Sequence, residues 1–188
     1  MDIGIILLIG IGGIALLLIV LYNRIVALRQ RYRQAFSDID IQLKLRYDLI
    51  PNLVETVKGY VSHEKTLLEN VTNARAEAMN TKDVAERAKA EGMLGMALTN
   101  LLAVAENYPD LKASENFMGL QRELADIENK VAAARRFFNN AVAEYNTVIE
   151  QFPAVLVARM FNFTAQELFN VPEQEKIQID QPVKVVFQ

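Results

Sequence analysis

Apolar residues recur at every third or fourth position between Phe117 and Phe152. The steps alternate between three and four residues without exception over five heptads, which is the spacing of one face of a helix. Charged residues such as Arg122, Lys130 and Glu144 lie between them, as expected on a solvated face. The apolar positions are Phe117, Leu120, Leu124, Ile127, Val131, Ala134, Phe138, Ala141, Tyr145, Val148 and Phe152. A long helix with such a stripe needs other helices packed along it, so the pattern predicts an all-α fold.

A block without charged or strongly polar residues extends from Ile3 to Leu21. As a helix rising about 1.5 Å per residue it would extend roughly 28 Å, which matches the hydrocarbon core of a bilayer. A cleaved signal peptide is the alternative, but it needs a basic start and a shorter apolar core. This chain starts with Met1 and Asp2. We therefore predict an uncleaved, single-pass transmembrane anchor over residues 1–21.

Four arginines follow the apolar block, and no Lys or Arg precedes it. The positive-inside rule then places the N-terminus outside and the rest of the chain in the cytoplasm. The opposite orientation, with the rest of the chain in the periplasm or outside the cell, is the alternative. These juxtamembrane side chains are also candidates for contact with anionic lipid. They are Arg24, Arg29, Arg31 and Arg33.

Neither Gly nor Pro occurs between Ala15 and Ile50, so the anchor is expected to run straight into the first helix of the soluble part. Proline removes a backbone donor and disfavours a helical residue before it. At Pro51 the helix is therefore expected to kink, or to break and restart.

Three further helices are expected. The second carries apolar positions from Leu53 to Ala78, and the third runs from Val84 to Glu106. Ser114 is a plausible N-cap for the long fourth helix described above. Four helices with short connections form an antiparallel up-and-down bundle, which we predict over residues 22–152.

A short C-terminal helical segment is predicted over residues 153–172. Thr164 and Glu167 have the spacing of a capping box, in which each side chain bonds to the other's backbone at a helix start. The apolar anchors of this segment are Phe161, Phe163 and Phe169.

An extended tail is predicted over residues 173–188. Apolar residues recur there at two-residue spacing, which is typical of a strand, and Pro182 suits an edge or an interruption. Either the tail is a flexible terminus, or tails of neighbouring subunits pair. Five apolar residues favour pairing, and they are Ile177, Ile179, Val183, Val185 and Phe187.

Composition and motifs argue against catalysis. The net charge of −3 argues against a nucleic-acid partner, and the absence of cysteine excludes thiol chemistry and disulfides. His63 and Glu64 begin like a zinc-protease motif, but Leu67 stands where that motif needs its second histidine. With one histidine in the chain, we predict no catalytic residue, metal site or cofactor.

Polar residues concentrate around Pro51. Asp48, Asn52 and Glu55 are candidate interaction or hinge positions together with the proline. The alternative is structural: Asp48 and Asn52 satisfy backbone groups freed by Pro51. Arg135 lies beside the apolar stripe and is expected to pair with an acid across the bundle.

Several segments of the chain together are typical of one protein family. They are Asp48 to Tyr60 (DLIPNLVETVKGY), His63-Glu64, Asn107 to Lys112 (NYPDLK), Tyr145-Asn146, Phe152-Pro153 and Pro182 to Phe187 (PVKVVF). In these segments the chain resembles the LemA family. The resemblance implies a single-pass membrane protein with an antiparallel four-helix domain and no established enzymatic activity. Proteins of this kind are often encoded near membrane metalloproteases.

Anchor, bundle and missing catalytic groups together predict a non-catalytic, membrane-anchored helical scaffold. It would act through self-association or by binding membrane proteins, so the expected partners are the lipid bilayer and further copies of the chain. The alternative is an accessory subunit of a membrane protease or envelope quality-control system. A third option is an enzyme with an unrecognised site near Asp48 and Glu55.

Overall fold

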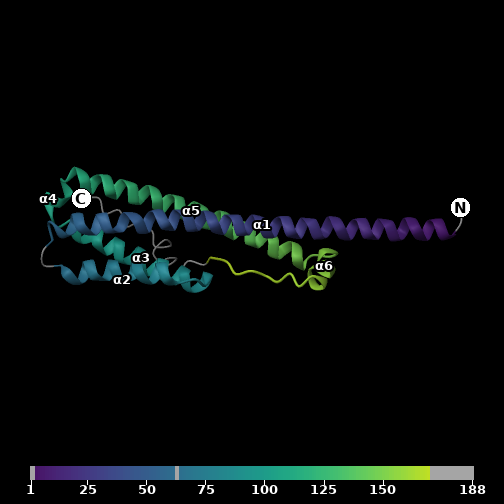
Figure 1. Ribbon diagram of the computed structural model, residues 1–188. Coiled ribbons are helices and arrows are strands. Elements are labelled where there is room, and N and C mark those ends of the chain that lie inside the picture. Colours follow the sequence, from purple (N-terminus) through teal and green to yellow (C-terminus); the bar gives the residue numbers. More distant parts are fainter. Residues whose placement is uncertain (1–2, 62–63, 170–188) are drawn as a thin grey trace, which may run out of the picture. The chain divides into compact units, whose positions relative to one another are not determined.

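The computed structural model describes residues 3–61 and 64–169. All regular secondary structure within this part is helical, as Figure 1 shows, which confirms the all-α prediction. The helices are α1 (Ile3–Lys58), α2 (Lys65–Asn80), α3 (Val84–Ala105), α4 (Pro109–Lys112), α5 (Glu115–Glu150) and α6 (Ala154–Met160).

The apolar N-terminal block continues into the residues after it without interruption, because α1 is one helix of 56 residues. Of the two alternatives predicted at Pro51, the break and restart is wrong, since α1 passes through it and ends at Lys58. The kink stays a prediction. A proline inside a helix leaves the carbonyl four residues earlier without its backbone donor, here that of Tyr47. Arg75 of α2 supplies the missing donor, with its Nε 2.7 Å from the Tyr47 carbonyl oxygen. The helix therefore continues because a neighbouring side chain replaces the lost bond.

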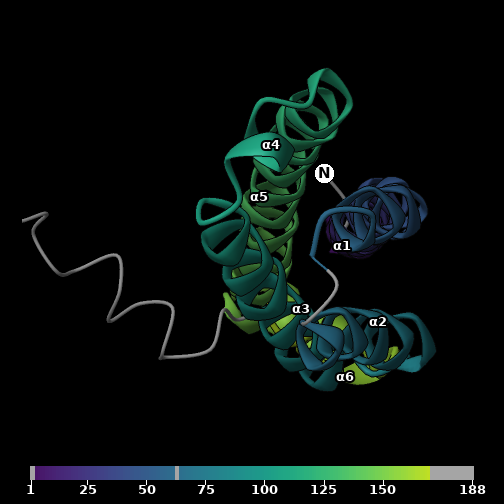
Figure 2. The same ribbon diagram turned by 90° about the vertical axis from the view of Figure 1, so that its left-hand side faces the viewer.

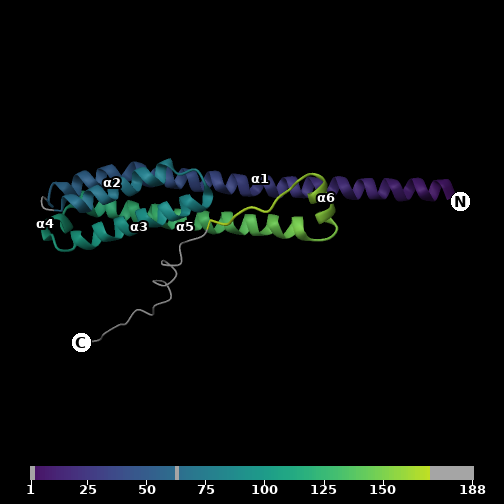
Figure 3. The same cartoon turned by 90° about the horizontal axis from the view of Figure 1, so that it is seen from below.

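The helical hairpin of α2 and α3 differs from its prediction at one end only. α2 begins at Lys65, and Leu53 belongs to α1 rather than to the second helix. α3 begins at Val84 as predicted, and Asp83 caps that helix by accepting hydrogen bonds from the backbone N–H groups of Ala85 (3.0 Å) and Glu86 (3.1 Å). α2 and α3 lie side by side (Figure 3), and α4 lies in the connection from α3 to α5 (Figure 2).

The apolar stripe of α5 is buried along most of its length. Ser114 lies at its start, with its Oγ 3.5 Å from the backbone nitrogen of Phe117. Phe152 is an exception at 81% exposure. It lies in the turn between the end of α5 and the start of α6, outside the helix that the spacing assumed. The buried members are Phe117, Leu124, Ile127, Val131, Phe138, Ala141, Tyr145 and Val148.

The predicted C-terminal helix is shorter than expected. α6 ends at Met160, and the described residues after it, to Phe169, form no helix, so Thr164 and Glu167 do not make a capping box. Residues 161–169, here called the strap, are instead bound to α5 by the side chain of Asn146. Its amide nitrogen donates to the Gln166 carbonyl (2.8 Å), and its oxygen accepts from the Gln166 N–H (2.9 Å).

The described residues form two compact units, and α1 and α5 contribute to both. The anchor unit comprises residues 3–39 and 134–168, and the head unit comprises residues 40–133 with Phe169. In the anchor unit the core contains two aromatic pairs, Tyr32 with Tyr145 and Phe36 with Phe138. In the head unit the fully buried core includes Leu43, Leu53, Val71, Leu94, Leu101 and Leu111. The predicted divisions after residues 21, 152 and 172 stay predictions.

Candidate functional site

A buried ion pair lies inside the head unit. Arg46 of α1 is 2% exposed and Glu91 of α3 is 1% exposed, and both stand among apolar core residues. Arg46 Nη1 lies 2.8 Å from Glu91 Oε2, and its Nε lies 2.8 Å from Oε1 of Glu128 on α5. One guanidinium thus lies between carboxylates from two other helices, a role that suits the several N–H groups of arginine better than the single ammonium of lysine.

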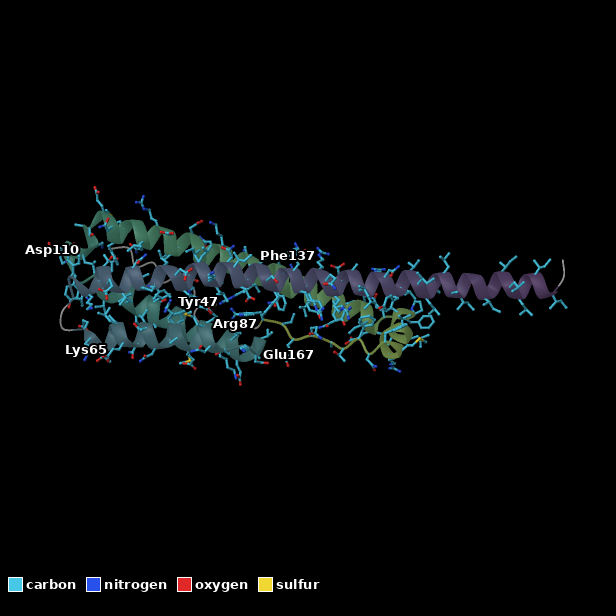
Figure 4. All side chains as sticks on the ribbon, in the orientation of Figure 1. Tyr47, Lys65, Arg87, Asp110, Phe137 and Glu167 are labelled. Atoms are coloured by element: carbon cyan, nitrogen blue, oxygen red, sulfur yellow. The ribbon has the colours of Figure 1, made fainter. Side chains whose placement is uncertain are left out.

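The hydroxyl of Tyr47 completes this cluster from the neighbouring position of α1, donating to Oε1 of Glu91. Burial is the largest cause that raises the pKa of Tyr47, and the bond to the Glu91 carboxylate raises it further. The hydroxyl therefore stays protonated and acts as a donor at physiological pH. Figure 4 shows Tyr47 close to Arg87 of α3, another arginine of this region.

Two further contacts extend the cluster outward. Arg87 Nη1 lies 2.6 Å from Oδ1 of Asp40 on α1. Arg75 of α2 binds the Tyr47 carbonyl as described above. Helices α1, α2, α3 and α5 thus meet through polar bonds at one level of the head unit. We refer to Arg46, Tyr47, Glu91 and Glu128, with Arg75, Arg87 and Asp40 around them, as the polar cluster.

The polar cluster has the chemistry of a structural network of ion pairs and hydrogen bonds. Arg46 and Arg87 pair with the three carboxylates of the cluster, and Arg75 binds a backbone carbonyl. Within the described residues, no group of three or more His, Asp or Glu side chains is arranged to hold a metal ion. Polar residues at core positions can fix which helices pair and in which register, at some cost in stability. The cluster therefore supports assembly of the head unit.

The candidate positions near Pro51 are all exposed on α1. Glu55 lies 3.2 Å from Lys58, and the Thr56 hydroxyl donates to the Asn52 carbonyl (2.8 Å). The guanidinium of Arg75, rather than Asp48 or Asn52, satisfies the carbonyl freed by the proline. Of the four candidates, Glu55 lines a groove of about 460 Å³ between α1 and α2, so it stays a candidate contact residue.

Two of the four arginines predicted to lie next to the membrane contact side chains of the anchor unit. The Arg29 guanidinium lies over the ring of Phe163 at 5.2 Å. Arg31 lies 2.7 Å from Glu144 and over the ring of Phe137 at 5.7 Å; Figure 4 labels Phe137 on α5. Arg24 and Arg33 are exposed. His63 and the tail residues Ile177, Ile179, Val183, Val185 and Phe187 lie outside the described residues.

Sequence reasoning missed the buried partners Arg46 and Glu91. A signal was present: Arg46 continues the apolar series Ile39, Leu43, Ile50 and Leu53 at steps of three and four. A charged residue at such an inward position has to find a partner, because burying an unpaired charge is very costly.

The sequence model that describes the LemA family matches residues 35–187 of this chain. The Magnetosome protein MamQ of Magnetospirillum gryphiswaldense is 23% identical over 179 residues, covering 81% of this chain and 66% of the relative. The Magnetosome protein MamQ 2 of Paramagnetospirillum magneticum is also 23% identical, covering 88% and 69%. The Protein LemA of Metamycoplasma hominis is 24% identical, covering 84% and 73%. The alignment thus spans slightly less than two thirds of the first of these relatives.

Proposed function

Because the chain belongs to the LemA family, we propose that it is a non-catalytic, membrane-anchored helical scaffold. It acts by self-association or by binding other membrane proteins. One observation carries the proposal: a single helix, α1, contains both an apolar span and the buried side chains that hold the head unit together. Such a chain presents a folded surface at a membrane.

The membrane anchor is supported by length, hydropathy and exposure. The most apolar window of α1 has a mean hydropathy of 3.0, and none of it is buried within the chain. Exposed residues of this stretch include Leu8 at 71% and Ile9 at 68%. An apolar surface that large favours a lipid environment over water. The exposed Arg24 and Arg33 support an orientation with the head unit in the cytoplasm.

The head unit is proposed to be an antiparallel four-helix bundle of α1, α2, α3 and α5. The polar cluster supports this arrangement, since Arg46 bridges α1 to α3 and α5 while Arg75 bridges α2 to α1. Short connections between α2, α3 and α5 favour antiparallel neighbours.

Two grooves on the head unit support protein binding. One of about 420 Å³ lies between α2 and α3, and the other, of about 650 Å³, lies between α3 and α5. Met96 lines both and is 46% exposed, while Met93 lines the first and is 47% exposed. Methionine is flexible and polarizable, and it is common at binding surfaces that adapt to their partners.

In-cell photo-crosslinking tests the proposal. A photoreactive residue at Met93 is expected to give adducts with the chain itself or with other membrane proteins. The matched control is Glu123 on α5, which is exposed but lines neither groove. Adducts with a membrane protease would favour the accessory-subunit alternative, which rests on the family resemblance. A yield of adducts at Met93 no higher than the yield at Glu123 would contradict binding through these grooves.

A further inference from the structure

Helix α6 of the anchor unit exposes its large apolar side chains and buries its small ones. Ala154, Val157 and Ala158 are buried. Leu156 and Met160 lie one turn apart on the opposite face and are 54% and 67% exposed. An amphipathic helix on a water-soluble surface has the reverse arrangement. The face is extended by residues on either side of α6, Phe152 at 81% and Phe161 at 53% exposure.

The strap that follows α6 is held at the end of the apolar span. The ring of Phe161 lies 4.7 Å from that of Tyr22, and the ring of Phe163 lies 5.9 Å from it. Tyr22 directly follows Leu21, the last residue of the span. The Arg29 guanidinium over Phe163 adds a second contact between α1 and the strap. Figure 1 and Figure 3 both show α6 beside α1, and the N-terminal part of α1 continues past it.

We propose that Phe152, Leu156, Met160 and Phe161, here called the α6 patch, insert into the membrane interface of the leaflet from which α1 emerges. The proposal rests on the proposed function, because it requires α1 to span the bilayer. If residues 3–21 lie in the hydrocarbon core, Tyr22 lies at headgroup depth, and its ring contact places Phe161 at the same depth. Tyr is enriched at that depth, and Phe and Leu are typical of the apolar face of helices that lie in the interface.

Lipid is the occupant that the surroundings of the patch favour. Its apolar surface adjoins the exposed apolar surface of α1, so one medium covers both. The exposed cations Arg24 and Arg159 lie beside this junction in sequence and suit anionic headgroups. Two attachments, α1 and the α6 patch, would restrict rotation of the anchor unit about the membrane normal. A second copy of the chain or another protein on the patch is an alternative that the experiment separates.

Tryptophan depth measurement tests the proposal on the complete chain. The chain contains no Trp, so Leu156→Trp and Met160→Trp each introduce a single fluorophore at a half-exposed site that tolerates it. The variants are reconstituted in liposomes of anionic and zwitterionic lipid, with or without brominated phosphatidylcholine as quencher. Ile11→Trp reports whether the apolar N-terminal span lies in the hydrocarbon core. Met93→Trp is the matched control in the head unit, with exposure close to that of Leu156.

Interfacial elements insert their apolar face about 5–10 Å into the headgroup and acyl boundary. Leu156→Trp and Met160→Trp should therefore show blue-shifted emission. Lipids brominated near the carbonyl end of the acyl chain should quench most of this emission. Quenching should weaken as the bromine moves toward the chain terminus, whereas Ile11→Trp should be quenched most by deep bromines. Met93→Trp should keep its emission with every lipid.

The outcomes separate the inference from the proposed function. If Ile11→Trp is not quenched, the anchor itself is wrong. If Ile11→Trp is quenched while both α6 variants behave like Met93→Trp, the anchor holds and the α6 proposal is overturned. A blue shift at Leu156 or Met160 without quenching would mean that protein covers the patch, which also overturns it.

Discussion

Glu91 accepts bonds from Arg46 and Tyr47 inside the head unit, so replacing it by leucine is the most informative single change. The Glu91→Leu substitution keeps a side chain of similar volume and removes the charge. The Arg46 side chain is 2% exposed and that of Glu91 is 0% exposed, so water cannot replace the lost carboxylate. Arg46 keeps its ion pair with Glu128, whose side chain is 40% exposed and partly solvated.

Removing one partner of a buried ion pair costs about 3–5 kcal/mol when the remaining charge is left in the core without a partner. In Glu91→Leu, Glu128 still compensates part of the Arg46 charge. Exposed pairs contribute only about 0.2–1 kcal/mol. Arg46 and Glu91 are both buried, but Glu128 still pairs with Arg46 in the variant. Glu91→Leu is therefore expected to lower the free energy of unfolding by about 3 kcal/mol, the lower end of the range for buried pairs. The double variant with Arg46→Met removes both charges, and we expect it to cost clearly less than the sum of the single changes.

Guanidinium unfolding of the complete chain in detergent, followed by far-ultraviolet circular dichroism, measures these differences. Asp126→Ala is the control, since Asp126 pairs with Lys130 on the exposed face of α5, and its loss should cost at most about 0.5 kcal/mol. Two results would contradict a stabilising role of the buried ion pair. Glu91→Leu would lower the free energy of unfolding no more than this control does, or its effect would simply add to that of Arg46→Met.

Three further predictions concern the apolar stripe, the orientation and the tail. Phe138→Ala should destabilise the chain by about 3–5 kcal/mol because Phe138 is buried, whereas exposed Arg136→Ala should cost little; equal thermal shifts would contradict the assigned face. Cysteine at exposed Lys82 should resist an impermeant thiol reagent in intact cells, with any outer membrane permeabilised, and prompt labelling would reverse the orientation. Deleting residues 174–188 should reduce assembly size if the tails pair; an unchanged assembly and unchanged thermal stability would refute pairing.

The elements that depend on local pattern were predictable from the sequence. The continuity of α1 before Pro51, the start of α3 at Val84 and most of the α5 stripe follow from the absence of helix breakers and from the hydrophobic period. Pro51 shows where local pattern fails. Its effect on α1 depends on Arg75, which is 24 positions later in the chain and reaches the freed carbonyl only after α2 has packed against α1.

Tertiary contacts also explain the other differences. Thr164 and Glu167 have helix-start spacing, but the Asn146 amide binds the backbone of Gln166 between them and holds the strap in a non-helical conformation. The apolar residues expected to anchor a C-terminal helix are distributed differently as well. Phe169 is buried, whereas Phe161 is more than half exposed and belongs to the α6 patch.

The mass of the complete chain in lipid nanodiscs tests the central proposal most directly. Native mass spectrometry resolves the 21.2 kDa chain from its multiples and from complexes with other proteins. A scaffold that acts by association should appear as a defined multiple of the chain, or bound to another membrane protein, after gentle extraction from its native membrane. A species of one chain alone, without any co-purifying protein across the accessible concentration range, would contradict the proposal.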